Sequence, residues 1–218
     1  MKKITLAFLL IFILAAISSA HQPRLVYDQE RITINKPEIS KAFYGELKGG
    51  PITYKIDSKV PFKLYVGLLV PDLKGVEKDI SAKIYFNNRL LFALNGQPFK
   101  WKPFYEEFGG DNYYSGPERT IKAAAGSYLI KVFSPDNKGK YVLAVGDKES
   151  FPPGEIFHTL IVLPQLKPFF EKSPLTGYFN IIGIFFLIML ITFVLFVALL
   201  LGSILFLKKR LLRPGQNI

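Results

Sequence analysis

Few residues of this 218-residue chain could carry chemistry. It has two histidines, His21 and His158, and no cysteine. The lack of cysteine excludes a disulfide-stapled scaffold, a thiolate zinc site and a cysteine nucleophile. The sequence contains no Gly-x-Ser-x-Gly elbow, phosphate-binding loop or His-Glu-x-x-His zinc motif. It therefore predicts a protein that is not an enzyme.

His21 is the residue with the clearest alternative chemistry. If a signal peptide is removed after Ala20, the free amino group and the imidazole of His21 could together chelate copper. His158 is the candidate second histidine ligand. A copper-dependent envelope protein or enzyme is therefore the alternative to a non-enzymatic role.

Acidic residues suggest a second metal, calcium. Glu106, Glu107 and Asp111 lie close together in sequence, and calcium prefers several oxygen ligands. Their spacing does not match an EF-hand loop, and they could equally be solvated charges that balance Lys100 and Lys102. No cofactor is expected, with calcium and copper as the alternatives.

The same part of the chain is rich in aromatic residues. Residues 95–118 show no alternation of apolar and polar positions, so we expect a long loop, and loops of this length are often functional. Exposed rings here could stack on sugars, or they could cover an open end of the core. The candidate binding residues are Trp101, Phe104, Tyr105, Tyr113 and Tyr114.

Strands are expected to position these residues. Between about residues 32 and 145 apolar side chains alternate with polar ones, as in Phe62, Leu64, Val66, Leu68 and Val70. Gly, Pro, Asn and Asp separate the alternating runs, and a tight turn is predicted at residues 87–88. Seven to nine strands without intervening helices predict a mainly β fold, a β-sandwich or jelly roll, with a closed barrel as the alternative.

Two of these runs, with residues 134–139 between them as a hairpin loop, resemble the final hairpin of bacterial pre-peptidase C-terminal domains. The matching positions are Gly126, Tyr128, Ile130 and Val132, followed by Gly139, Tyr141, Leu143 and Val145. The resemblance implies a small jelly-roll-like sandwich with an accessory or binding role, and it supplies no catalytic residues. A membrane helix in place of a peptidase would be a departure from that family.

Hydrophobic runs at both ends predict the topology. Lys2 and Lys3, the apolar residues 4–17 and the small residues up to Ala20 are typical of a signal peptide, residues 1–20, with an uncleaved anchor as the alternative. Residues 178–207 predict a transmembrane helix, because no charge occurs between Ile181 and Leu207. The basic tail, residues 208–218, predicts a cytoplasmic C-terminus through Lys208, Lys209, Arg210 and Arg213.

The domain at residues 21–150 would then lie outside the cytoplasm, in a single-pass plasma-membrane protein of the cell envelope. A Pro-rich juxtamembrane segment with a short helix at 155–163, residues 151–177, would join it to the helix. That segment could lie on the outer leaflet or pack under the sandwich. The expected function is a non-enzymatic binding module with the bilayer and an envelope protein or a glycan as partners. A nucleic-acid partner is not expected despite the net charge of +11, because the lysines are scattered.

Overall fold

The computed structural model describes residues 21–27, 31–107, 109–179 and 181–211. The predicted signal peptide and Arg213 lie outside these ranges. Within α3, the side chains of residues 181–182, 185–186, 189, 207 and 209–211 are not described either.

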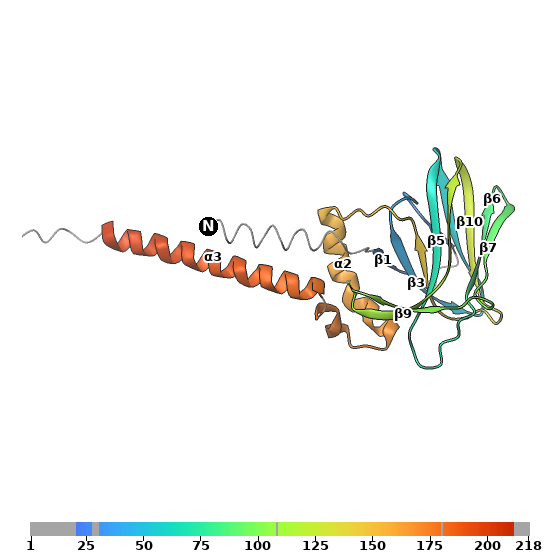
Figure 1. The fold of residues 1–218 in the computed structure, drawn as a ribbon. Coiled ribbons are helices and arrows are strands. Elements are labelled where there is room, and N and C mark those ends of the chain that lie inside the picture. The colour runs from blue at the N-terminus through green and yellow to red at the C-terminus, as the bar shows by residue number, and fades with distance from the viewer. Residues whose placement is uncertain (1–20, 28–30, 108, 180, 212–218) are drawn as a thin grey trace, which may run out of the picture.

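Eleven strands in the described ranges form two facing sheets (Figure 1). The six-stranded sheet has the order β1-β3-β11-β5-β9-β8, and the five-stranded sheet has the order β2-β4-β10-β6-β7. The strands are β1 (Gln22–Leu25), β2 (Arg31–Thr33), β3 (Lys41–Lys48), β4 (Ile52–Ser58), β5 (Phe62–Pro71), β6 (Ser81–Phe86), β7 (Arg89–Leu94), β8 (Lys102–Glu106), β9 (Asp111–Ala123), β10 (Gly126–Phe133) and β11 (Lys138–Val145). The prediction of a mainly β sandwich is confirmed, with two sheets in place of a single closed one.

The alternation in the sequence correctly predicts which side chains face the core. In β5, Leu64, Val66, Leu68 and Val70 are all buried between the sheets. The tight turn at residues 87–88 is also confirmed. Asn87 and Asn88 have φ angles of 47° and 64°, which a two-residue turn between β6 and β7 requires and asparagine tolerates.

Two predictions about this region are wrong. β10 and β11 are not a hairpin: β10 pairs with β4 and β6 in one sheet, and β11 pairs with β3 and β5 in the other. Residues 134–139 therefore cross from sheet to sheet. Ser134 stabilises this corner, because its hydroxyl donates a hydrogen bond to the carbonyl of Lys138 and accepts one from the same residue's amide.

Residues 95–118 are not a long loop either, since they contain β8 and the start of β9. β8 is an edge strand with almost every side chain exposed, so no alternation marks it in the sequence. Pro103 is tolerated there because an edge strand has unpaired amide positions.

Helices follow the sandwich (Figure 1). α2 (Pro153–Leu166) includes the predicted helix at 155–163, and Pro153 occupies a first-turn position that needs no amide donor. The short helices η1 (Lys167–Phe170) and η2 (Pro174–Tyr178) lead to α3 (Ile181–Leu211), which has 31 residues. Among the described residues, no helix combines the length and hydropathy of a membrane span.

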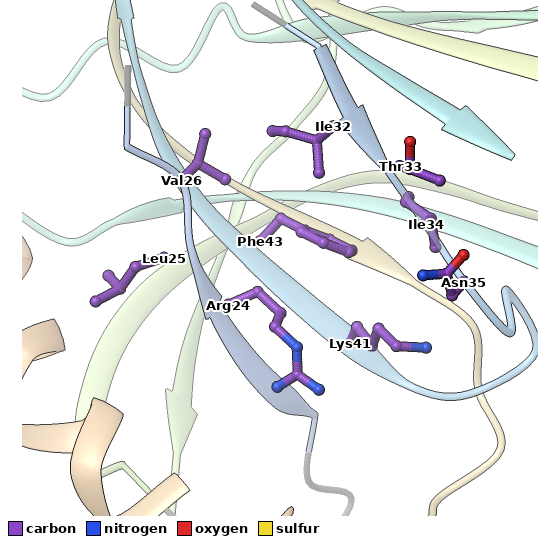
Figure 2. Close-up of a pocket in the computed structure, with 9 residues that line it drawn as sticks. All are labelled: Arg24, Leu25, Val26, Ile32, Thr33, Ile34, Asn35, Lys41 and Phe43. Carbon is purple, nitrogen blue, oxygen red and sulfur yellow. The ribbon is translucent and has the colours of Figure 1, made fainter. Parts of the chain in front are cut away.

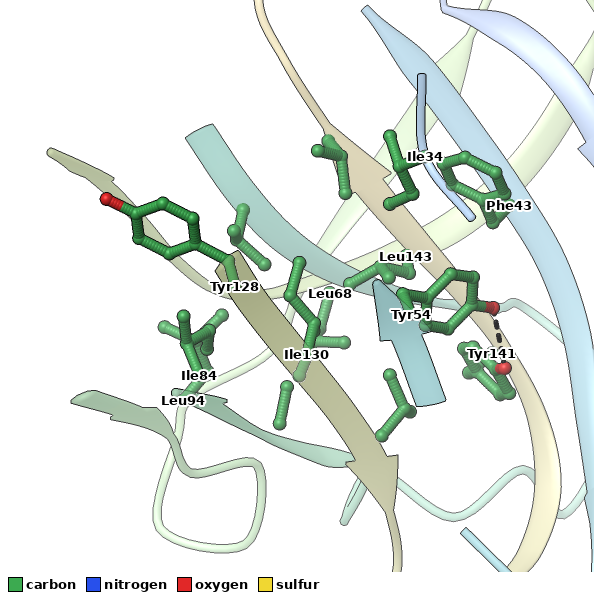
Figure 3. Close-up of a cluster of buried hydrophobic side chains, with 14 of the residues drawn as sticks. Ile34, Phe43, Tyr54, Leu68, Ile84, Leu94, Tyr128, Ile130, Tyr141 and Leu143 are labelled. Carbon is green, nitrogen blue, oxygen red and sulfur yellow. Dashed lines mark hydrogen bonds between the residues drawn. The ribbon is translucent and has the colours of Figure 1, made fainter. Parts of the chain in front are cut away.

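A pair of tyrosine hydroxyls is buried within the core (Figure 3). The hydroxyl oxygens of Tyr54 and Tyr141 are 2.8 Å apart, and both side chains are fully buried. Burial raises the pKa of both hydroxyls, so both stay protonated at neutral pH. One hydroxyl donates to the other, so each oxygen has a hydrogen-bond partner in the dry core.

Replacing one tyrosine of this pair with phenylalanine should lower the free energy of unfolding, because the remaining hydroxyl is buried without a partner. Tyr141→Phe leaves the Tyr54 hydroxyl without its partner, which should lower the free energy of unfolding by about 1–3 kcal/mol. The double variant Tyr54→Phe, Tyr141→Phe removes both hydroxyls, so its loss should be smaller than the sum of the two single losses. Denaturant unfolding, followed by the fluorescence of Trp101, measures all three variants. Simple additivity would contradict this account.

Candidate functional site

A buried carboxylate joins the sandwich to the helices that follow it. Asp111, fully buried at the start of β9, accepts hydrogen bonds from Lys167 at 2.6 Å and from Lys172 at 2.8 Å. Lys167 is itself only 1% exposed and also donates to the carbonyl of Gly109. Lys172 donates to the carbonyl of Gly110 at 3.1 Å. We call Asp111, Lys167 and Lys172 the lysine clamp.

The backbone after α2 brings both lysines to one carboxylate. Lys167 begins η1, and Glu171, which follows the last residue of η1, has a left-handed φ angle of 57°. This reverses the chain, so that Lys172 returns to the same side as Lys167. The turn before β9 supplies the carbonyls of Gly109 and Gly110, and the Gly110 φ angle of 72° suits glycine.

Aromatic rings surround the clamp. The hydroxyls of Tyr44 and Tyr113 are 3.0 Å apart, and the ring of Phe170 packs edge-on against Tyr113 with 5.1 Å between centroids. Phe169 packs against Tyr44 at 5.6 Å. Burial raises the pKa of Tyr44 and of Tyr113 well above the ordinary value, so neither acts as a base near neutral pH. The rings of this cluster therefore contribute by packing against one another.

The five predicted binding aromatics do not form one surface. Tyr113 belongs to the buried cluster around the clamp, and Trp101 packs against the core with its indole nitrogen donating to the carbonyl of Gly96 at 2.9 Å. The ammonium of Lys78 covers the ring of Tyr114 at 3.9 Å. Phe104 and Tyr105 on β8 are 44% and 56% exposed. Of the five, these two are the exposed ones, while Trp101 and Tyr114 are half-buried and Tyr113 is buried.

Two of the three predicted calcium ligands, Asp111 and Glu106, are engaged with protein groups. Both carboxylate oxygens of Asp111 accept from the clamp lysines, and Glu106 accepts from the amide of Gly109 at 2.6 Å. Glu107 lies exposed in the turn after β8. The described residues contain no group of three or more His, Cys, Asp or Glu side chains that could hold a metal ion.

The two histidines have different surroundings. Burial lowers the pKa of His21, which lies next to β1. His158 on α2 lies 3.5 Å from Glu155 and 3.4 Å from Arg24, whose guanidinium also makes a bidentate pair with Glu155 at 2.7 and 2.9 Å. Copper binding at His21 stays a prediction.

A cavity of about 320 Å³ opens between β1, β2 and β3 (Figure 2). Arg24 and Lys41 lie at one end, and Val26, Ile32 and Phe43 form apolar walls. The Lys41 ammonium donates to the carbonyl of Lys36 at 2.8 Å. Burial, and then the charge of Arg24, lower the pKa of Lys41 to about 8.

The predicted membrane-anchoring cations are described only in part. Lys208 is exposed within α3, and Lys209 and Arg210 continue the same helix. The role of these three residues and of Arg213 stays a prediction.

Sequence reasoning missed the lysine clamp and the cavity. Lys167 stands between Leu166 and Pro168 in a mostly apolar stretch, and a charge in such a setting is often a buried, paired one. That was the available signal for Lys167. Nothing in the sequence indicated that Asp111 is its partner, because 56 positions separate them.

Comparisons with known proteins place the chain in no family. No protein-family model matches it, and no curated protein matches it. Among solved structures, it is similar to the pre-peptidase C-terminal domain of a collagenase from Bacillus anthracis, with a TM-score of 0.36 and 15% identity, over 55% of this chain and 98% of that one.

Two further solved structures are similar. CorA, a surface-associated copper-binding protein of Methylomicrobium album BG8, gives a TM-score of 0.29 and 7% identity over 58% of this chain and 100% of that one. A β-glucosidase from Paenibacillus barengoltzii gives 0.26 and 10% over 57% and 13%. TM-scores this low do not establish a shared fold. The β-sandwich follows from the strand order of the two sheets.

Breaking the lysine clamp should strongly destabilise the protein. Asp111→Asn leaves the buried Lys167 ammonium without a counter-charge, which should lower the free energy of unfolding by about 3–5 kcal/mol. Asp147→Asn breaks the exposed pair with Lys63 and should cost less than about 1 kcal/mol. Denaturant unfolding of both variants and the parent measures the difference. Equal losses would contradict a structural role for the clamp.

The lowered pKa of Lys41 predicts a pH dependence. Between pH 8 and 10.5 the unfolded chain keeps a proton at Lys41 that the folded chain has lost. The contribution of Lys41 to the free energy of unfolding should therefore rise as pH increases through this window. Unfolding of the parent and of Lys41→Gln across the window isolates that slope. A parent whose slope is no steeper than the variant's would refute the prediction.

Proposed function

We propose that the chain is a membrane-anchored, non-enzymatic module of the cell envelope whose β-sandwich lies outside the cytoplasm. Its head would bind a partner next to the bilayer. The observation that carries the proposal is the lysine clamp, because it ties the head to the segment that leads into α3. A head held in this way is presented at a fixed position instead of on a free tether.

The sequence of α3 supports its role as the anchor. No charged residue occurs from Ile181 to Leu207, and Lys208, Lys209 and Arg210 follow at once. As a helix, this uncharged run would be roughly 40 Å long at 1.5 Å per residue, which exceeds the ~30 Å hydrocarbon core. The support for a span is therefore the amino-acid sequence, since no helix among the described residues combines the length and hydropathy of one. The basic end then favours a cytoplasmic C-terminus.

The exposed edge strand β8 supports a binding role for the head. Phe104 and Tyr105 expose their rings on this strand, and β8 pairs on one side only, with β9. Side chains that could do chemistry near it are committed to other contacts: Asp111 to two lysines, and Tyr113 to Tyr44. We therefore propose the free edge of β8 as the partner surface, with Phe104 on one face of the sheet and Tyr105 on the other, and with an envelope protein or a glycan as the ligand.

Photo-crosslinking in native membranes tests both parts. The full chain should stay with the membrane pellet after an alkaline carbonate wash. A photoreactive phenylalanine analogue at Tyr105 should then crosslink to an envelope component, whereas the same analogue at Leu90 should not. Leu90 is the matched control, because it is also 56% exposed but lies on β7 at the edge of the other sheet.

Two outcomes would contradict the proposal. Release of the full chain by carbonate would exclude the anchor. Equal crosslinking at Tyr105 and Leu90, or none at either position, would exclude β8 as the partner surface.

A further inference from the structure

The outer face of α2 is apolar. Phe157 and Ile161, one turn apart, are 68% and 63% exposed. Gly154, His158, Pro164 and Gln165 share this side of the helix, which presents no Asp, Glu, Lys or Arg side chain. A helix on a soluble surface normally presents charged residues outward, so this face is unusual.

Packing of the sandwich does not explain the apolar outer face. The opposite side of α2 already provides the buried contacts, through Thr159, Val162, Leu163 and Leu166. The charged residue Glu155 is turned toward β1, where it pairs with Arg24. Polar residues at 157 and 161 would leave these contacts unchanged, so the two large apolar side chains must be explained by something outside the head.

More exposed apolar side chains continue from α2 toward α3. Leu175 and Tyr178 of η2 are 67% and 51% exposed, and Phe179, just after η2, is 77% exposed. α2 packs against η2, and η2 contacts the start of α3. We call Phe157, Ile161, Leu175, Tyr178 and Phe179 the apolar collar.

We propose that the apolar collar lies in the interfacial layer of the bilayer, so that α2 rests on the lipid surface beside the point where α3 enters. This inference rests on the proposed function of α3 as the anchor. Figure 1 shows α2 crosswise to α3, between α3 and the sandwich. If α3 crosses the bilayer, α2 therefore lies along its surface.

The chemistry of the collar favours lipid over a second copy of the chain. Burial of Phe and Leu side chains at the acyl boundary is favourable, and Tyr residues are enriched at the interface, where Tyr178 would lie. The collar is also continuous along the chain with the start of α3. Phe179 is followed two residues later by α3, so its side chain cannot be far from the bilayer.

The absence of cysteine allows a direct test in the full chain. Single variants Phe157→Cys, Ile161→Cys, Leu195→Cys and Leu90→Cys are spin-labelled and reconstituted in phosphatidylcholine–phosphatidylglycerol vesicles. For each spin label, the rate of collision with oxygen, which partitions into lipid, is compared with the rate of collision with a nickel chelate, which stays in water. Leu195, in the middle of α3, reports on the anchor. Leu90 belongs to β7, which Figure 1 shows on the side of the head away from α3, and it reports on water.

Labels at 157 and 161 should show an oxygen-to-nickel ratio several-fold above that at 90 and closer to that at 195. Ratios at 157 and 161 equal to that at 90, with a lipid-like ratio at 195, would overturn the inference and leave the anchor intact. A water-like ratio at 195 would overturn the anchor itself. If the labels at 157 and 161 are shielded from both reagents, protein, such as a second copy, covers the collar. That result would also overturn the inference that the collar lies in lipid.

Discussion

The pairing of Asp111 with Lys167 and Lys172 is the interaction on which the arrangement of the molecule depends. Removing a carboxylate and an ammonium from water is costly, and the cost is offset only when the pair has good geometry and further hydrogen bonds. Here the carbonyls of Gly109 and Gly110 provide these bonds. The contact therefore holds η1 and the residue that follows its cap against the start of β9, while the Arg24–Glu155 pair holds the start of α2 against β1.

The aromatic cluster around the clamp explains why this pair can persist. Tyr44, Tyr113 and Phe170 exclude water, and the mutual hydrogen bond of the two tyrosines leaves no unsatisfied hydroxyl among them. The low-dielectric surroundings strengthen the attraction between the charges. Packing and charge pairing thus depend on each other: the rings need the clamp to bring η1 to β9, and the buried Asp111–Lys167 pair needs the rings to exclude water.

The sequence predicted the faces of the strands but not their partners. Alternation in β5, β10 and β11 correctly placed their apolar residues in the core, because period two follows from strand geometry. It could not show that β10 and β11 lie in different sheets, since Tyr128 and Tyr141 both face the same interior. The candidate site was predicted only in part. Aromatic composition singled out Phe104 and Tyr105 together with three rings that the fold covers, and no local pattern relates Asp111 to Lys167.

The edge strand β8 links the clamp to a binding role. An exposed edge strand can pair with a strand of another chain and cause aggregation. Proteins prevent this pairing with proline, lysine or short strands at the edge. β8 has all three features: five residues, Lys102 and Pro103. Asp111, opposite Glu106 where β9 starts, holds this hairpin through the clamp. Rings on a strand restrained in this way lose little conformational entropy when they bind, which makes Phe104 and Tyr105 better suited to recognition than the same residues on a free loop.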